Sequence, residues 1–174
     1  MNAFFRTDWA LSKSISVWKI YSSKLAGALL TALLAVQPAS VRPASAQVAS
    51  DASFQTLVNG SISDSCTTGV CTVTGGLQNN ANSVLFHSFS QFSLPDAADG
   101  PSVLFIDPGV DDIVARVTGG DLSIINSTIF TSADSTANLF LINPSGIQFG
   151  PSGQLDLGGG FVGSTASEIF FDSQ

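Results

Sequence analysis

Three aspartates and one histidine come closest, by residue type and spacing, to a catalytic or metal-binding group in this sequence. Asp107, Asp111 and Asp112 form the densest group of acids, and paired carboxylates can hydrolyse glycosidic bonds or bind calcium. Their spacing does not match a calcium-binding loop, so a solvated acidic surface is the favoured interpretation. His87 is the sole histidine and lies beside Phe86 in an apolar stretch. We expect it to be a packed or surface residue of a strand, not a catalytic base.

The rest of the sequence has no pattern that indicates catalysis or ligand binding. It shows no nucleophile–base pairing, no glycine-rich phosphate loop and no set of metal ligands. After residue 46 it contains neither Trp nor Tyr, the side chains that most often stack against sugars. We therefore expect no catalytic residue, no metal, no cofactor and no small-molecule substrate. Asn126-Ser127-Thr128 matches the glycosylation acceptor pattern, but this pattern is too common to carry weight.

The charges divide the chain into two segments. Residues 1–46 contain five basic residues and one acidic residue, a net charge of +4. Residues 47–174 contain one basic residue and twelve acidic residues, a net charge of −11. Such an asymmetry predicts that the two segments have different fates. A surface as acidic as that of the second segment repels phosphate backbones, so nucleic acid is not an expected partner.

Residues 1–46 have the pattern of a helical secretory signal peptide. A basic region precedes the apolar run at 25–36, and Ala44-Ser45-Ala46 fits the small-residue cleavage rule. Cleavage is therefore predicted between Ala46 and Gln47. A membrane anchor is the alternative, but about 12 apolar residues are fewer than the roughly 20 that span a bilayer. We expect export through the general secretory translocon, with 47–174 as the mature chain.

Two cysteines, Cys66 and Cys71, flank a four-residue stretch that suits a hairpin loop. In an oxidising periplasm such a pair is most simply a structural disulfide. Closing so short a loop would stabilise the fold by about 2 kcal/mol on the chain-entropy estimate. Free thiols and a metal site are the alternatives, although no further cysteine or nearby histidine would complete a metal site.

Short apolar strands separated by Asn, Pro, Gly and Ser corners, with no helical segment between them, predict a parallel β-helix after residue 53. Two interleaved series of strands repeat at about 17 to 22 residues, as successive faces of a coil would. The first series is 122–125, 139–142 and 161–162, and the second is 128–130, 147–149 and 169–171. The competing fold is an antiparallel sandwich built from hairpins.

The same spacing makes two further predictions about the coil. Phe130, Phe149 and Phe171 occupy equivalent positions in the second series and are expected to stack in the interior. The small, polar residues 47–53 are expected to be a flexible start. Because Gln174 follows a predicted strand directly, we also expect a chain that stops before the final coils of its solenoid.

One stretch, ANLFLINPSGIQFGPSGQLDLGGGFVGSTA at 137–166, resembles the secretion domain of filamentous-haemagglutinin-like exoproteins, the passengers of two-partner secretion. The resemblance extends over 54–171 and includes LFHSFSQFSL at 85–94 and IVARVTGG at 113–120. The family's second motif usually reads Asn-Pro-Asn-Gly, and the family's earlier Asn-Pro-Asn-Leu motif is absent here. The residues of this chain that match the second motif are Asn143, Pro144, Ser145, Gly146 and Ile147, with Ser145 at the departing position.

The resemblance implies an all-β, right-handed parallel β-helix, preceded by the signal peptide. It implies a non-catalytic module that directs an exoprotein or adhesin to an outer-membrane two-partner transporter, contacted through its periplasmic domains. The protein would then be secreted or lie at the cell surface. The motif at 143–147 would be needed for secretion, either through direct recognition or by supporting the recognised fold. Residues 47–174 would be the N-terminal part of such a domain, which normally continues for several more coils.

Two functions from other classes compete with this one. A β-helical enzyme acting on polysaccharides would need carboxylates that converge in a groove, whereas the sequence shows only a cluster in a turn. A surface adhesin would bind a ligand with its own coils.

Overall fold

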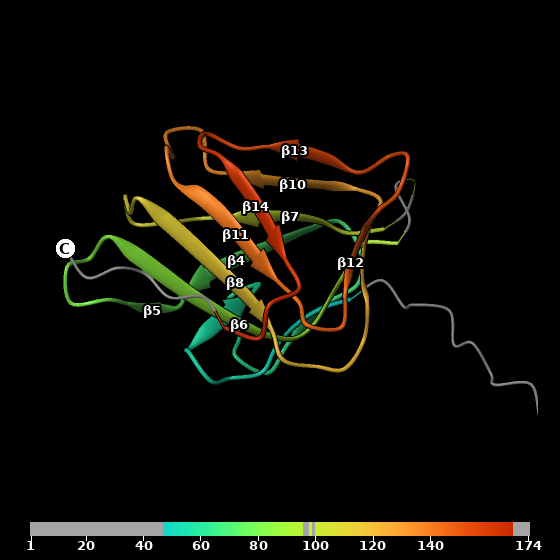
Figure 1. Cartoon of the computed structure of the whole chain (residues 1–174), viewed down its shortest axis with the longest axis horizontal. Coiled ribbons are helices and arrows are strands. Elements are labelled where there is room, and N and C mark those ends of the chain that lie inside the picture. The colour runs from blue at the N-terminus through green and yellow to red at the C-terminus, as the bar shows by residue number, and fades with distance from the viewer. Residues whose placement is uncertain (1–46, 96–97, 99, 169–174) are drawn as a thin grey trace, which may run out of the picture. The chain divides into compact units, whose positions relative to one another are not determined.

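The computed structural model describes residues 47–95, 98 and 100–168, all of which belong to the unit Val41–Gln174. These residues are all-β, without a helix, and form a β-solenoid of about three turns (Figure 1). The predicted signal peptide at 1–46 and the predicted strand at 169–171 lie outside the described residues. Nowhere in the described part is there a helix long and apolar enough to cross a membrane. The predicted β-helix is confirmed.

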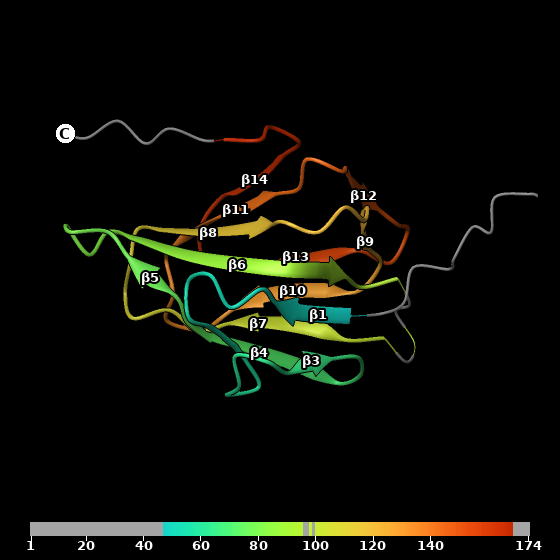
Figure 2. The same ribbon diagram turned by 90° about the horizontal axis from the view of Figure 1, so that it is seen from below.

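Three sheets form the faces of the coil (Figures 1 and 2). The first sheet has the order β14 (Phe161–Ser164), β11 (Asn138–Ile142), β8 (Asp112–Val117), β6 (Val84–Ser93), β1 (Gln47–Ser50) and β3 (Ser65–Cys66), with β5 (Leu77–Gln78) also paired to β6. The second has the order β13 (Gln154–Asp156), β10 (Thr128–Thr131), β7 (Ser102–Phe105), β4 (Val70–Gly75) and β2 (Thr56–Val58). The third consists of β12 (Ile147–Phe149) and β9 (Ser123–Ile125).

Successive coils pair in parallel, residue by residue. Asp112 of β8 lies beside Asn138 of β11, and Leu139 of β11 lies beside Phe161 of β14. The first predicted strand series is confirmed for 139–142 and 161–162, which stack in parallel, and wrong for 122–125, which belongs to the third sheet. The second series is wrong for its described members, because 128–130 belongs to the second sheet and 147–149 to the third. In the coils that begin with β8 and β11 the chain passes through the first, third and second sheets in turn. The strand β10 lies between β9 and β11, so the spacing from 122–125 to 139–142 joins two different faces and is shorter than a whole coil. Strands that stack on one another are a whole coil apart.

The core lies between the sheets and is aliphatic toward the C-terminal coils and aromatic toward the N-terminal ones. Leu85, Ile113 and Leu139 occupy one inward column of the first sheet, and each is at most 2% exposed. Phe89, Phe92 and Phe105 are also buried, with ring centroids 5.2 to 6.4 Å apart. Aromatic pairs at these separations add to the stabilisation that burial of their area provides.

The predicted interior stack of Phe130, Phe149 and Phe171 is wrong for its two described members. Phe130 lies between the buried Ile129 and Thr131 and therefore points away from the core, because side chains alternate along a strand. Phe149 belongs to the third sheet, in the last described coil, and is 42% exposed. Phe171 lies outside the described residues.

The N-terminal segment is ordered, contrary to the expectation of a flexible start. β1 pairs in antiparallel fashion with both β3 and β6, and Val48 is fully buried. The carboxylate of Asp51, just after β1, accepts hydrogen bonds from the hydroxyls of Ser88 and Thr118. Partial burial raises the pKa of Asp51, but these hydrogen bonds and those from Ser53 outweigh it and hold the pKa below its usual value. A single buried valine and backbone pairing hold this strand, which polar composition alone does not reveal.

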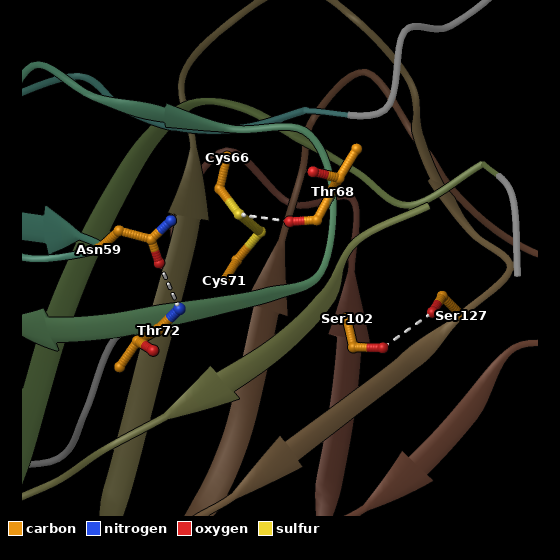
Figure 3. The surroundings of a disulfide bond; sticks show 7 residues. All are labelled: Asn59, Cys66, Thr68, Cys71, Thr72, Ser102 and Ser127. Carbon is orange, nitrogen blue, oxygen red and sulfur yellow. Dashed lines mark hydrogen bonds between the residues drawn. A yellow bond between two sulfur atoms is a disulfide. The ribbon is translucent and has the colours of Figure 1, made fainter. Parts of the chain in front are cut away.

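A disulfide joins Cys66 of β3 to Cys71 of β4, with Cα atoms 5.6 Å apart (Figure 3). Both cysteines are buried, and their strands belong to the first and second sheets respectively. The intervening residues therefore link two faces of the coil and do not form a hairpin between paired strands. Nearby, Asn59 Oδ1 accepts a hydrogen bond from the Thr72 amide, and the hydroxyls of Ser102 and Ser127 lie 3.1 Å apart (Figure 3).

Adjacent glycines after β8 allow a matched test of how closely the coils pack. A Cβ atom added to Gly119 would overlap the backbone carbonyl of Ser90, whereas one added to Gly120 would meet nothing within 4 Å. We expect Gly119→Ala to lower the free energy of unfolding by about 2 kcal/mol, because the backbone of Ser90 must move. Gly120→Ala should leave it unchanged or raise it slightly. Equal denaturation midpoints for the two variants in urea would contradict this packing.

Candidate functional site

The motif at 143–147 forms the corner between β11 of the first sheet and β12 of the third. Its residues differ sharply in accessibility. Asn143 is fully buried, whereas Pro144 and Ser145 are exposed. The side chains of Pro144 and Ser145 are therefore accessible from outside, whereas that of Asn143 is not. A partner approaching from outside would contact Pro144 and Ser145, not Asn143.

Asn143 connects three successive coils through hydrogen bonds. Its side-chain amide donates to the carbonyl of Asp121 at 2.9 Å and to the hydroxyl of Ser123 at 2.8 Å, both in the preceding coil. Its backbone amide donates to the carbonyl of Ser164 in the following coil at 2.9 Å. Within the corner, its Oδ1 accepts from the Ser145 amide, as in other asparagine turns. A side chain buried with all of its polar atoms paired fixes this corner against the coil before it.

Gly146 completes the corner with a backbone conformation that suits glycine. Its φ is +114°, which L side chains rarely adopt, and its carbonyl accepts a hydrogen bond from the Ser123 amide. A Cβ atom added here would come within 2.8 Å of the Leu122 side chain, which is flexible enough to move. Backbone strain, more than lack of space, therefore explains why glycine stands at this position.

Two further asparagines, less buried than Asn143, also connect neighbouring coils: Asn126, just after β9, and Asn138, the first residue of β11. Asn126 donates to the carbonyl of Pro95 in the preceding coil and accepts from the amide of Ser152 in the following one. Asn138 donates to the Asp112 carboxylate and accepts from the Gly160 amide, again in the coils before and after. Neither role was predicted from the sequence, in which Asn126 is notable only as part of a glycosylation pattern. An asparagine beside a strand end was the available signal.

A comparison with known families places these corners in context. The model of the TPS secretion domain, a two-partner secretion domain, matches residues 46–174. The chain belongs to the TPS secretion domain family. Comparisons with curated proteins and with solved structures found no match. TPS domains in general are not enzymes, the proteins that carry them are secreted exoproteins, and the domain implies interaction with a two-partner transporter.

Of the three aspartates singled out in the sequence, Asp107 and Asp111 lie in the turn between β7 and β8 of the TPS domain, and Asp112 is the first residue of β8. Asp107 Oδ1 accepts hydrogen bonds from the backbone amides of Gly109 and Val110, so this carboxylate stabilises the turn. Asp112 Oδ1 accepts from Asn138, and Asp111 is exposed. Among the described residues, no group of three or more His, Cys, Asp or Glu side chains could hold a metal ion.

A shallow groove lies on the outer face of β7, β10 and β13, away from these aspartates. Its apolar lining comes mainly from Leu104, Ile106, Phe130 and Leu157. Asp156 is the one carboxylate among the described residues that line it, whereas hydrolysis of a glycosidic bond ordinarily uses two. The groove therefore offers no support for the polysaccharide-acting alternative.

His87, predicted to be a packed or surface residue of a strand, is buried inside the TPS domain. It is 1% exposed, and its ring lies 5.7 Å from that of Phe105 and 6.3 Å from that of Phe89. Neither ring nitrogen has a hydrogen-bond partner among the described residues. Burial disfavours the charged imidazolium and lowers the pKa of His87 from 6.5 to about 4. The ring is therefore neutral near pH 7 and acts as part of the apolar core.

Proposed function

We propose that residues 47–174 are a non-catalytic secretion module that directs an exoprotein to its outer-membrane two-partner transporter. The observation that carries this proposal is the corner at 143–147, where the family's motif builds a rigid turn with exposed Pro144 and Ser145. Membership of the TPS family supports the same function.

The proposed route begins at the general secretory translocon. The basic and apolar pattern of residues 1–46 supports a signal peptide, with cleavage between Ala46 and Gln47. The first described strand begins at Gln47, so cleavage there would leave β1 whole. In the periplasm, Cys66 and Cys71 would be oxidised to the disulfide. The periplasmic domains of the transporter would then bind the chain, where backbone pairing with an open strand edge could supply affinity.

Within this function, the buried and exposed residues of the corner have separate roles. Asn143 and Gly146 support the fold, because one carries the hydrogen bonds between coils and the other the unusual φ. Pro144 and Ser145 are the residues that the transporter could contact directly. Ile147, the first residue of β12, is partly buried and packs against the core. We propose that all five residues are needed for secretion, for one or the other of these reasons.

A secretion assay with and without the cognate transporter tests the proposal. With the transporter present, the culture medium should contain a product whose N-terminus, determined by mass spectrometry, is Gln47. Without it, the same cleaved product should remain in the periplasm. Release that does not depend on the transporter would contradict the secretion function. Recovery of the intact chain from Met1 in the membrane fraction would contradict the signal peptide and support an anchor.

A further inference from the structure

Residues 47–66 join the coil in a different way from the strands that follow them. β1 pairs with β6, and β2 with β4, in antiparallel fashion. By contrast, β6, β8, β11 and β14 pair in parallel in the first sheet, as do β4, β7, β10 and β13 in the second. β3 has only two residues, and among the described strands it pairs only with β1. We call residues 47–66 the strap, because they lie outside the repeating parallel pattern of the coil.

The backbone of the strap is strained. Ala52, Gln55 and Asn59 have φ angles of +66°, +54° and +51°, a region that L residues other than asparagine and aspartate rarely adopt. Among the described residues, the one other non-glycine residue with a positive φ is Asn82. Backbone conformations of this kind persist only where surrounding contacts hold them. The strap therefore needs contacts with the coil to keep its conformation.

Non-covalent contacts hold the strap at several points, some of which are open to water. Val48 and Val58 are fully buried and anchor it in the core. The Asp51 carboxylate accepts an exposed hydrogen bond from the Thr118 hydroxyl, and the Ser90 hydroxyl makes exposed hydrogen bonds to backbone carbonyls of β1. Hydrogen bonds that water can replace contribute little net stability. None of these contacts involves β3, the last strand of the strap.

The disulfide fixes this last strand of the strap to the parallel coil. Cys66 ends β3, and Cys71 lies in β4, where it pairs in parallel with Val103 of β7. The bond holds the two Cα atoms 5.6 Å apart (Figure 3), whereas five residues of extended chain can span about 17 Å. Without the bond, the residues between the cysteines would allow β3 to leave β4 entirely. β1 would then lose β3, one of its two partner strands.

We propose that the redox state of Cys66 and Cys71 controls whether the strap is closed on the coil. A dithiol reductant would supply two electrons and two protons, convert the disulfide to two thiols and itself become a disulfide. β3 would then separate from β1, and the strained backbone at Ala52 and Gln55 would relax. A disulfide oxidant would reverse the step, so the strap closes in oxidising compartments and opens in reducing ones. This inference concerns the folded protein and does not depend on the proposed secretion function.

Amide hydrogen exchange of the purified protein, followed by NMR with and without dithiothreitol, tests the proposal. Reduction should accelerate exchange in β1 and β3 by about tenfold or more and change exchange in β8 and β11 by less than about twofold. The double variant Cys66→Ala/Cys71→Ala should exchange like the reduced wild type and should not respond to dithiothreitol. Alanine is chosen because both positions are buried and serine would bury a hydroxyl.

A matched pair of glycine variants tests the part played by strain. In the reduced protein, Ala52→Gly should slow exchange in β1, because glycine adopts a positive φ without strain. Asn82→Gly, which makes the same change outside the strap, should leave exchange in β1 unchanged.

Two results would overturn the proposal. One is unchanged exchange in β1 and β3 after mass spectrometry shows that both thiols of the wild type are free. The other is an equal acceleration in β8 and β11, which would show that the disulfide supports the whole coil. The reduced wild type decides between these results even if the double variant fails to fold.

Discussion

Asn143→Ala is expected to lower the free energy of unfolding by about 4 kcal/mol and to abolish secretion through the cognate transporter. The substitution removes the amide that bonds Asp121 and Ser123 and the oxygen that accepts from Ser145. Because the position is fully buried, the partners on the preceding coil would lose these bonds without gaining water. Urea denaturation of the purified protein and immunoblotting of the medium would measure the two effects.

Substitutions of the exposed corner residues separate folding from recognition. Ser145→Ala removes an exposed hydroxyl and should leave the free energy of unfolding within about 0.5 kcal/mol of wild type. If this variant folds normally but is not secreted, the transporter reads the corner directly. If it is secreted like wild type while Asn143→Ala is not, the motif acts through the fold. An Asn143→Ala protein as stable as wild type would refute the assigned hydrogen bonds.

Acidification is expected to destabilise the fold by about 3 kcal/mol between pH 6.5 and pH 4 through His87 alone. In this window the unfolded chain binds a proton at His87, with its ordinary pKa of 6.5, whereas the folded protein, with a pKa of about 4, does not. The unfolded state thus binds more protons, so stability falls as the pH falls, by about 1.4 kcal/mol per pH unit of difference. Below pH 4 the loss from this group is complete.

His87→Leu should remove most of this pH dependence, and denaturation in urea at a series of pH values would measure it. The titration of Asp51 does not account for a loss of stability between pH 6.5 and pH 4. Its lowered pKa gives a stabilisation that is present above the ordinary carboxylate range and is lost only as the pH falls through the folded value. An equally steep loss of stability between pH 6.5 and pH 4 in His87→Leu would show that another group is responsible.

The fold class followed from the sequence, but the assignment of strands to faces did not. Short strands with polar corners, no helix and a spacing of about 17 to 22 residues predicted a solenoid, because a repeated spacing is typical of stacked coils. The corners after Ile125 and Ile142, however, look alike in sequence although they join different pairs of sheets. The face on which a strand lies depends on which strand of the previous coil it pairs with. That partner lies a whole coil earlier in the chain, so the residues of the strand itself do not indicate which strand it pairs with.

In the candidate site, likewise, features set by neighbouring residues in the sequence were predictable, whereas contacts between coils were not. Asn143, Pro144 and Gly146 were predictable because each favours a turn through its own conformational preferences. The hydrogen bonds of Asn126 and Asn138 to neighbouring coils were not predictable, since asparagine occurs just as readily in exposed loops where it makes no such bonds. His87 was expected to be packed or on the surface, and only the positions of Phe89 and Phe105 settle that it is buried.

The parallel register between coils has a consequence for the order in which the chain can fold. Each strand of the first sheet from β8 onward pairs with a strand of the coil just before it, as in Val84 with Asp112 and Leu139 with Phe161. Contacts between residues separated by a single coil of chain form with little loss of loop entropy. A chain that emerges N-terminus first could therefore complete one coil on the last without waiting for the remainder. Each finished coil would then serve as the template for the next.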